Sequence, residues 1–231
     1  MTTPTAIRAI RSFVRRQGRM TSAQEQALAT LWPVFGLELT GKLLDINAVF
    51  GRDAPKILEI GFGTGDALLE MAAQCPEQDF IGVDVHRPGV GRVLRELETR
   101  QLSNVRLFCA DATEVLASSI GDASLARVLL FFPDPWPKKR HQKRRIVQQP
   151  FVAQVHQKLM EGGQFHLATD WEDYATHMLA AMEAAPGFVN TVGTNNFCPR
   201  PEYRPITKFE RRGERLGHGI WDLVYAKEAP I

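Results

Sequence analysis

A glycine-rich turn near residue 60 is the first place where the sequence indicates chemistry. The segment 59–65 reads Glu-Ile-Gly-Phe-Gly-Thr-Gly, and a helix-like pattern begins right after it at Asp66. Because glycine has no Cβ, such a turn lets a ligand approach the backbone closely, here at Gly61, Gly63 and Gly65. The dinucleotide fingerprint Gly-x-Gly-x-x-Gly would need a third glycine where Asp66 stands, and this acid would repel a pyrophosphate. The turn therefore predicts a nucleotide-like ligand without a pyrophosphate, with Asp66 also expected to cap the helix.

Acidic residues stand at the ends of three successive apolar runs. Glu59 closes the run before the glycine turn, Asp84 follows the second run, and Asp111 follows the third. In a parallel sheet these positions meet at one edge, where ligands bind. Asp84 could then accept from ribose hydroxyls, Asp111 from an adenine amino group, and Glu59 from the ammonium of an amino acid. Each acid alone could be a helix cap or a surface charge, but together they predict S-adenosylmethionine as the cofactor.

A stiff, proline-rich turn follows the fourth apolar run. Residues 132–138 read Phe-Pro-Asp-Pro-Trp-Pro-Lys, and the three prolines restrict the backbone so that Asp134 and Trp136 point in fixed directions. A carboxylate beside an aromatic ring is suited to binding a nucleobase by hydrogen bonds and stacking. The alternative is a rigid surface turn with a tryptophan in the core.

A strongly basic run continues from this turn. Residues 138–145 include six lysines or arginines and no acid. Such a run is often only a solvated face, but here it adjoins the predicted reaction site, as a clamp on a polyanionic substrate would. The run therefore favours a nucleic acid as the substrate.

The elements that must position these residues alternate between short apolar runs and helix-like patterns. The run at 127–132 is almost wholly apolar, as expected of a central parallel strand that is covered on both faces. The alternation predicts an α/β fold, a doubly wound and mostly parallel Rossmann-like sheet with helices on both faces. The expected strands are 56–60, 80–83, 105–109, 127–132, 164–169 and 220–225, and the expected helices are 66–74, 87–100, 113–118, 145–160 and 170–184.

Two helix boundaries and one terminal segment carry further expectations. Gly162 and Gly163 are expected to end the helix at 145–160, and Asp170 is expected to cap the last helix. Residues 26–231 are predicted to form a single domain, preceded by a basic arm at 1–25. The arm is either a solvated terminus or a contact for RNA phosphates. Its arginines recur at steps of three to four residues: Arg8, Arg11, Arg15, Arg16 and Arg19.

Composition excludes several classes of protein. With 231 residues, 44% apolar and 23% charged, the chain can bury the core of one large domain. It contains no apolar run of eighteen residues to span a bilayer and no apolar leader for secretion. Its cysteines, Cys75, Cys109 and Cys198, form no paired motif, which argues against a disulfide framework or a zinc site. We therefore expect a cytoplasmic protein without a metal or a membrane partner.

The quoted motifs resemble those of the bacterial tRNA (guanine-N7-)-methyltransferase family, a class I S-adenosylmethionine-dependent family, over about residues 11–225. The most specific matching pieces are residues 59–65, 82–84, 132–138 with the basic run, 168–170 and 207–210. The resemblance implies transfer of a methyl group from S-adenosylmethionine to N7 of a guanine in the variable loop of tRNA, usually at position 46.

The resemblance also implies roles for individual residues. Around the cofactor it places Glu59, Asp84, Asp111 and Asp134. For substrate and RNA binding it implies Lys138, Arg140, Lys143, Arg144, Arg145, Asp170, Thr207, Lys208, Phe209 and Glu210. Guanine N7 has a lone pair and no proton, so the reaction needs no general base. Asp134 is therefore expected to be catalytic by stabilising the charge that develops on the purine.

Three other interpretations compete with this one. Another nucleic-acid base methyltransferase is the nearest, because Asp134-Pro135-Trp136 partly matches the acid-Pro-Pro-aromatic signature of base N6-methylases. A nicotinamide oxidoreductase is disfavoured by Asp66, and a non-catalytic RNA-binding protein would leave the glycine turn and the acids without a role. The sequence allows either a monomer or a homodimer.

Overall fold

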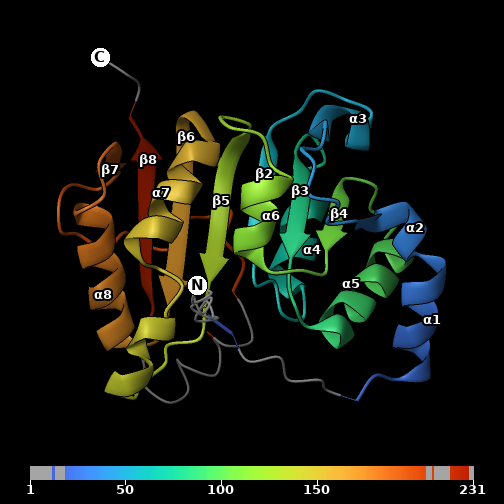
Figure 1. Ribbon diagram of the computed structural model, residues 1–231, viewed down its shortest axis with the longest axis horizontal. Helices are drawn as coiled ribbons and strands as arrows, with labels where there is room; N and C mark the ends of the chain where they lie inside the picture. The colour runs from blue at the N-terminus through green and yellow to red at the C-terminus, as the bar shows by residue number, and fades with distance from the viewer. Residues whose placement is uncertain (1–11, 14–18, 207–209, 211–218, 229–231) are drawn as a thin grey trace, which may run out of the picture.

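An eight-stranded sheet with the order β1-β4-β3-β2-β5-β6-β8-β7 forms the centre of the structure (Figure 1). This computed structural model describes residues 12–13, 19–206, 210 and 219–228. All pairings from β1 to β6 are parallel, while β8 runs antiparallel to both β6 and β7. The strands are β1 Gly36–Leu37, β2 Lys56–Ile60, β3 Asp79–Val83, β4 Val105–Phe108, β5 Leu125–Phe131, β6 Leu159–Thr169, β7 Phe188–Asn190 and β8 Trp221–Lys227. The predicted fold class is confirmed.

Helices connect the strands and cover both faces of the sheet (Figure 1). Helices α3, α6, α7 and α8 contribute buried side chains to one hydrophobic cluster, and α1, α4 and α5 contribute to the other. The α-helices are α1 Ser22–Thr30, α2 Trp32–Phe35, α3 Ile46–Phe50, α4 Asp66–Gln74, α5 Arg87–Thr99, α6 Ala112–Ser118, α7 Gln149–Lys158 and α8 Glu172–Glu183. A 3-10 helix, η1, spans Lys139–Arg144.

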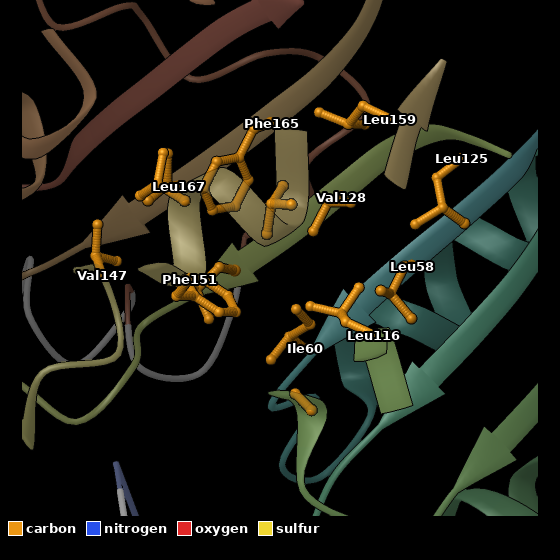
Figure 2. Close-up of a cluster of buried hydrophobic side chains, with 14 of the residues drawn as sticks. Leu58, Ile60, Leu116, Leu125, Val128, Val147, Phe151, Leu159, Phe165 and Leu167 are labelled. Atoms are coloured by element: carbon orange, nitrogen blue, oxygen red, sulfur yellow. The ribbon is translucent and has the colours of Figure 1, made fainter. Parts of the chain in front are cut away.

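The central strand β5 shows why the apolar run around 127–132 contains almost no polar residues. Val128 and Leu130 pack in the cluster that Figure 2 shows, between the sheet and α6 and α7. Leu129 and Phe131 belong to the cluster on the opposite face. Because successive side chains of a strand point to opposite faces, a strand buried on both sides must be apolar at every position.

The order of the strands places a ligand site next to β2. The chain moves outward from β2 to β3 and β4, and then returns to add β5 on the other side of β2. The loops after β2 and β5 therefore leave the sheet in opposite directions and open a crevice between them. The predicted glycine turn follows β2, and the predicted Asp134 turn follows β5. The topology thus brings the two motifs to one place.

The boundaries between residues 139 and 169 differ from the prediction. The helix expected at 145–160 begins only at Gln149, because Pro150 is suited to the first helical turn, and η1 occupies 139–144 instead. Gly162 and Gly163 do not end this helix but lie within β6, which already begins at Leu159. Gly162 has a φ of 70°, and the pairing of β6 with β5 shifts its register there. This irregular start of the strand could not be distinguished from a helix end in the sequence.

Two predicted helix caps are wrong. Gly65 is the N-cap of α4, and Asp66 is its first helical residue, paired with Arg92 at 2.7 Å. The N-cap of α8 is Trp171 rather than Asp170, and its amide donates to the hydroxyl of Thr169. Both acids precede or open a helix as expected, but neither stands at the N-cap position itself.

Most of the predicted basic arm lies outside the described residues, namely Arg8, Arg11, Arg15 and Arg16. Within the arm's predicted range, α1 begins at Ser22, where Thr21 and Gln24 form a reciprocal capping box. Among the residues that the structure describes, no helix is both long and apolar enough to cross a membrane.

Candidate functional site

A cavity of about 1060 Å³ opens at the carboxyl ends of β2, β3, β4 and β5. Three acids that the sequence singled out, Asp84, Asp111 and Asp134, line this cavity together with Gly61. The complete lining consists of residues 60–61, 83–88, 109–112 and 130–137, with Ser12, Phe13, Met20, Glu25 and Ile146. The structure therefore gathers residues from four separate loops at one edge of the sheet.

The glycine turn keeps the backbone bare at the cavity. Gly61, Gly63 and Gly65 have φ values of 74°, 56° and 75°, which disfavour any residue with a Cβ. A Cβ on Gly61 or Gly63 would meet no atom within 4 Å, so the space beside them is open. A Cβ on Gly89 would lie 2.2 Å from the carbonyl oxygen of Gly63, so α5 packs directly onto the turn. The turn combines open space on one side with rigid backing on the other.

Asp84 fixes the glycine turn to the start of α5. Its Oδ2 accepts from the amide of Gly63 at 2.8 Å, and its Oδ1 accepts from the amide of His86 at 2.8 Å. Burial raises the pKa of Asp84, and bonds from backbone amides, first that of His86 and then that of Gly63, act in the opposite direction. Each carboxylate oxygen has a further lone pair that can accept from a ligand hydroxyl on the cavity side.

Glu59 is a buried carboxyl group beneath the turn. Its side chain is 3% exposed, and its Oε2 has no hydrogen-bond partner among the described residues. Burial, followed by repulsion from Asp84, raises the pKa of Glu59 to about 8. A buried acid without a partner is costly, and a cationic ligand beside it would compensate the cost. Glu59 does not itself line the cavity, so its effect on a ligand depends on the narrow space around the turn.

Asp111 has two roles that are compatible. As the N-cap of α6, its Oδ1 accepts from the amide and the hydroxyl of Thr113 at 2.9 and 2.8 Å. Both of these bonds use one carboxylate oxygen, and the residue also lines the cavity. The other oxygen can therefore accept from a ligand amino group while the cap is kept.

The turn around Asp134 is held in an unusual conformation. Phe132 and Trp136, which flank the Pro133-Asp134-Pro135 segment, have φ values of 51° and 46°. Bulky residues adopt this region at a cost of about 1–3 kcal/mol each, which surrounding contacts must offset. The amide of Phe132 donates to Ala168 at 2.8 Å, and the indole of Trp136 donates to the carbonyl of Ser12 at 3.0 Å. The result is an exposed Asp134 side chain on a rigid wall of the cavity.

Arg145 supports this turn from behind instead of facing solvent. It is 3% exposed, donates to the carbonyl of Pro135 at 2.9 Å, and forms an ion pair with Asp173. Its guanidinium also lies over the ring of Tyr174, 4.8 Å from the centroid. Burial disfavours a contact between Arg145 and a phosphate in this arrangement, and the expected role of Arg145 in RNA binding stays a prediction.

The other cations of the basic run remain accessible. Lys138, Lys139, Arg140 and Lys143 are exposed, on and just before η1. Arg144 is half-buried, with its guanidinium 4.9 Å from the centroid of the Trp136 ring. The run thus forms a basic strip beside the Asp134 turn, defined here as residues 138–140 and 143.

Asp170 ends up at the same edge of the sheet. Ala168 pairs with Phe131, so the residues after β6 lie beside the turn after β5. Asp170 is half-buried and does not line the cavity itself. The structure therefore brings Asp170 near the site without giving it a contact there.

A buried ionic network that the sequence did not reveal lies behind the site. Arg204 is 0% exposed and donates to both oxygens of Asp222 at 2.7 and 2.8 Å and to both oxygens of Glu210 at 2.7 and 3.1 Å. Asp222 also bonds His166 at 2.7 Å, and Tyr203 bonds the other nitrogen of that ring at 2.9 Å. We call the residues Arg204, Asp222, Glu210, His166 and Tyr203 the Arg204 network.

The Arg204 network changes the expectation for residues 207–210. Thr207, Lys208 and Phe209 lie outside the described residues, whereas Glu210 is 4% exposed and paired with Arg204. In this structure the Glu210 carboxylate binds Arg204 and does not line the cavity. No local pattern marks an arginine for complete burial, since the partners that compensate its charge come from elsewhere in the chain.

Known proteins resemble this chain closely. A family model described as "Putative methyltransferase" matches residues 53–223. A protein of Alcanivorax borkumensis named tRNA (guanine-N(7)-)-methyltransferase is 59% identical, covering 96% of this chain and 93% of the relative. A Pseudomonas aeruginosa protein of the same name is 58% identical, covering 96% and 91%.

Solved structures share the fold at low sequence identity. The 16S rRNA methyltransferase KamB has a TM-score of 0.60 at 13% identity, covering 81% of this chain and 95% of its own. A 16S rRNA (adenine(1408)-N(1))-methyltransferase mutant from Catenulisporales acidiphilia, solved with its cosubstrate S-adenosylmethionine, has a TM-score of 0.57 at 14% identity, covering 84% and 93%. These two similarities establish the fold of the domain.

Proposed function

The chain belongs to the tRNA (guanine-N7-)-methyltransferase family, and from this premise we propose that the cavity at the carboxyl edge of its sheet is the site of methyl transfer. The enzyme transfers a methyl group from S-adenosylmethionine to N7 of a guanine in tRNA. The variable loop of tRNA, at position 46, is the proposed location of this guanine. Because the substrate is tRNA, the proposed place of action is the cytoplasm.

The residues around the cavity fit the cofactor. The buried Oε2 of Glu59 has no hydrogen-bond partner in the part of the chain that the structure describes, which suits the ammonium of the methionine part. Asp84 offers lone pairs to ribose hydroxyls, Asp111 offers one oxygen to the adenine amino group, and Gly61 and Gly63 leave the backbone open. When bound, S-adenosylmethionine supplies an electrophilic methyl group on a sulfonium.

The residues on the other side of the cavity fit the guanine. N7 attacks with its own lone pair, so positioning carries much of the rate and no side chain has to remove a proton from it. The modified purine gains positive charge, which the fixed carboxylate of Asp134 stabilises, and Asp134 can also accept from the guanine N1–H and amino group. The observation that carries the proposal is that one cavity gathers Asp84, Asp111 and this rigid Asp134 turn.

Identification of the product tests the proposal. The enzyme is incubated with methyl-labelled S-adenosylmethionine and with tRNA that lacks the modification, and the tRNA is digested to nucleosides for chromatography. We expect the label in 7-methylguanosine alone. Label in a methylated adenosine or cytidine would instead support another base methyltransferase.

The basic strip is expected to bind phosphates. Replacing Lys139, Arg140 and Lys143 together by alanine should weaken tRNA binding and flatten its dependence on salt. The slope of log affinity against log salt should fall by roughly 0.7–0.9 for each lost phosphate contact. Filter binding over a range of salt measures this slope, with Lys42→Ala as the control, since Lys42 is exposed in the loop before α3. An unchanged slope in the triple variant would rule out the clamp.

Binding of S-adenosylmethionine is expected to depend on the protonation of Glu59. The pKa of about 8 in the free protein means that this carboxyl is mostly protonated at pH 6–7. An ammonium beside it lowers that pKa, so binding releases a proton, and affinity should rise as the pH increases from 6 towards 8. Calorimetry in buffers with different ionisation enthalpies measures the released proton. In Glu59→Gln the release should disappear and the affinity should lose this dependence; a wild-type affinity without pH dependence would contradict the assignment.

A further inference from the structure

We propose that Trp171 is a stacking platform for an unpaired base of tRNA that neighbours the target guanine, an inference that rests on the proposed function. Trp171 directly follows Asp170 at the carboxyl end of β6. Ala168 pairs with Phe131 of β5, and neighbouring strands lie about 4.8 Å apart. The indole is therefore attached beside the Asp134 turn, at the rim of the edge where the cavity opens.

The backbone beneath Trp171 is fixed against the segment that carries the basic strip. Asp173, two residues further along, pairs with Arg145 and accepts from Gln142 at 3.3 Å. The carbonyl of Trp171 itself accepts from the amides of Tyr174 and Ala175 at 2.9 Å in the first turn of α8. Stacking of a base on Trp171 therefore requires no ordering of the main chain that carries the ring, which favours binding.

The exposure of the indole has no local structural explanation. Trp171 is 39% exposed and occupies the N-cap of α8 without a capping bond from its side chain. Two other tryptophans of the described part use their indole N–H in the fold: Trp136 donates to Ser12, and Trp32 donates to Glu38. Among the large hydrophobic side chains that are exposed in that part, Phe197 is the other aromatic. Trp171 thus presents an apolar face to solvent near a strip of cations.

This combination matches single-stranded nucleic acid in its chemistry. Proteins bind unpaired nucleotides by cations that contact the backbone and by aromatic rings that stack on the bases. The basic strip supplies the cations for the nucleotide backbone, and Trp171 supplies the aromatic ring for the base. Because the residues after β6 lie beside the turn after β5, the stacked base belongs to a nucleotide close to the guanine in the cavity. Stacking requires no particular base, so Trp171 contributes affinity more than sequence preference.

Kinetics with tRNA and a matched set of variants test this inference. Trp171→Ala removes the ring, Trp171→Phe keeps an aromatic face, and Met160→Ala removes a side chain of similar exposure (45%) near the opposite end of the same strand. We measure KM and kcat for unmodified tRNA, Kd for tRNA over a range of salt, and Kd for S-adenosylmethionine by calorimetry. Unchanged S-adenosylmethionine binding shows that the variants are folded.

The loss of the ring should raise KM and Kd for tRNA on the order of tenfold, the value of one stacked base. The salt slope should stay that of the wild type because no phosphate contact is lost. Trp171→Phe should recover most of the affinity, and Met160→Ala should behave as the wild type. A tRNA KM within twofold of the wild type in Trp171→Ala, or an equal loss in Trp171→Phe, overturns the stacking role. Failure of the proposed function is distinguishable, since the wild-type enzyme itself would then produce no 7-methylguanosine.

Discussion

Replacement of Asp134 by alanine is expected to lower kcat for tRNA methylation by about 100- to 1000-fold, the range seen when a fixed charge-stabilising group is removed from an active site. Asp134 lies on a wall of the cavity. The backbone of this wall is left-handed at two aromatic residues, Phe132 and Trp136, which is an unfavourable conformation for bulky side chains. A rigid carboxylate reorganises little as positive charge develops on the purine. It therefore stabilises the transition state more effectively than water, whose dipoles must reorient.

Two further variants separate the charge of Asp134 from its other effects. Asp134→Asn keeps the shape and one acceptor but removes the charge, and we expect a smaller but still large loss of kcat. Asp53→Ala, an exposed acid just before β2 at the opposite edge of the sheet, should retain wild-type kcat. Single-turnover measurements with saturating tRNA and cofactor report the chemical step. A near-wild-type kcat in Asp134→Ala would refute the catalytic assignment.

Replacement of Arg204 by methionine should destabilise the fold by about 3–5 kcal/mol, because it removes the buried positive charge that two buried carboxylates share. Arg204 is fully buried, and each of the two carboxylates that it binds, Asp222 and Glu210, is at most 4% exposed. Its guanidinium also lies over the rings of Phe131 and Phe132, 5.9 and 5.8 Å from their centroids. Loss of the guanidinium should therefore weaken the packing of Phe131 and Phe132 before the Asp134 turn, and it should also leave Glu210 less firmly held.

Urea denaturation measures this effect against a matched arginine. Arg100→Met removes an exposed arginine that pairs with Glu96 one helical turn away, at 3.0 Å, and should cost about 0.5 kcal/mol or less. If both variants unfold at the same urea concentration, the Arg204 network does not stabilise the fold as described.

The sequence predicted the parts of the fold that are encoded locally. The strand at 56–60 and the helix at 66–74 match the structure residue by residue, because the periodicity changes abruptly at the glycine turn. The helix expected from residue 145 begins later for a tertiary reason in addition to the local effect of Pro150. Arg145 is drawn into contacts with Pro135 and Asp173, and its neighbours form a 3-10 turn instead.

The candidate site was predictable in its position but not in its internal bonding. The acids at the ends of β2, β3 and β4 could be aligned because parallel strands end at a common edge. Nothing in the sequence distinguishes Arg145 from Lys143, although one braces the Asp134 turn and the other is exposed. In the same way, the burial of Arg204 depends on Asp222, which lies eighteen residues away in the chain.

A tRNA with a single altered atom tests whether the methyl group is transferred to guanine N7. Its proposed target guanine, in the variable loop, is replaced by 7-deazaguanine, in which a C–H group stands in place of N7 and the Watson–Crick edge is unchanged. The incorporation of labelled methyl groups is compared with that of the same tRNA carrying guanine. We expect full incorporation into the guanine-containing tRNA and none into the 7-deazaguanine tRNA, with similar Kd values for both. Equal incorporation into both tRNAs would refute methyl transfer to N7.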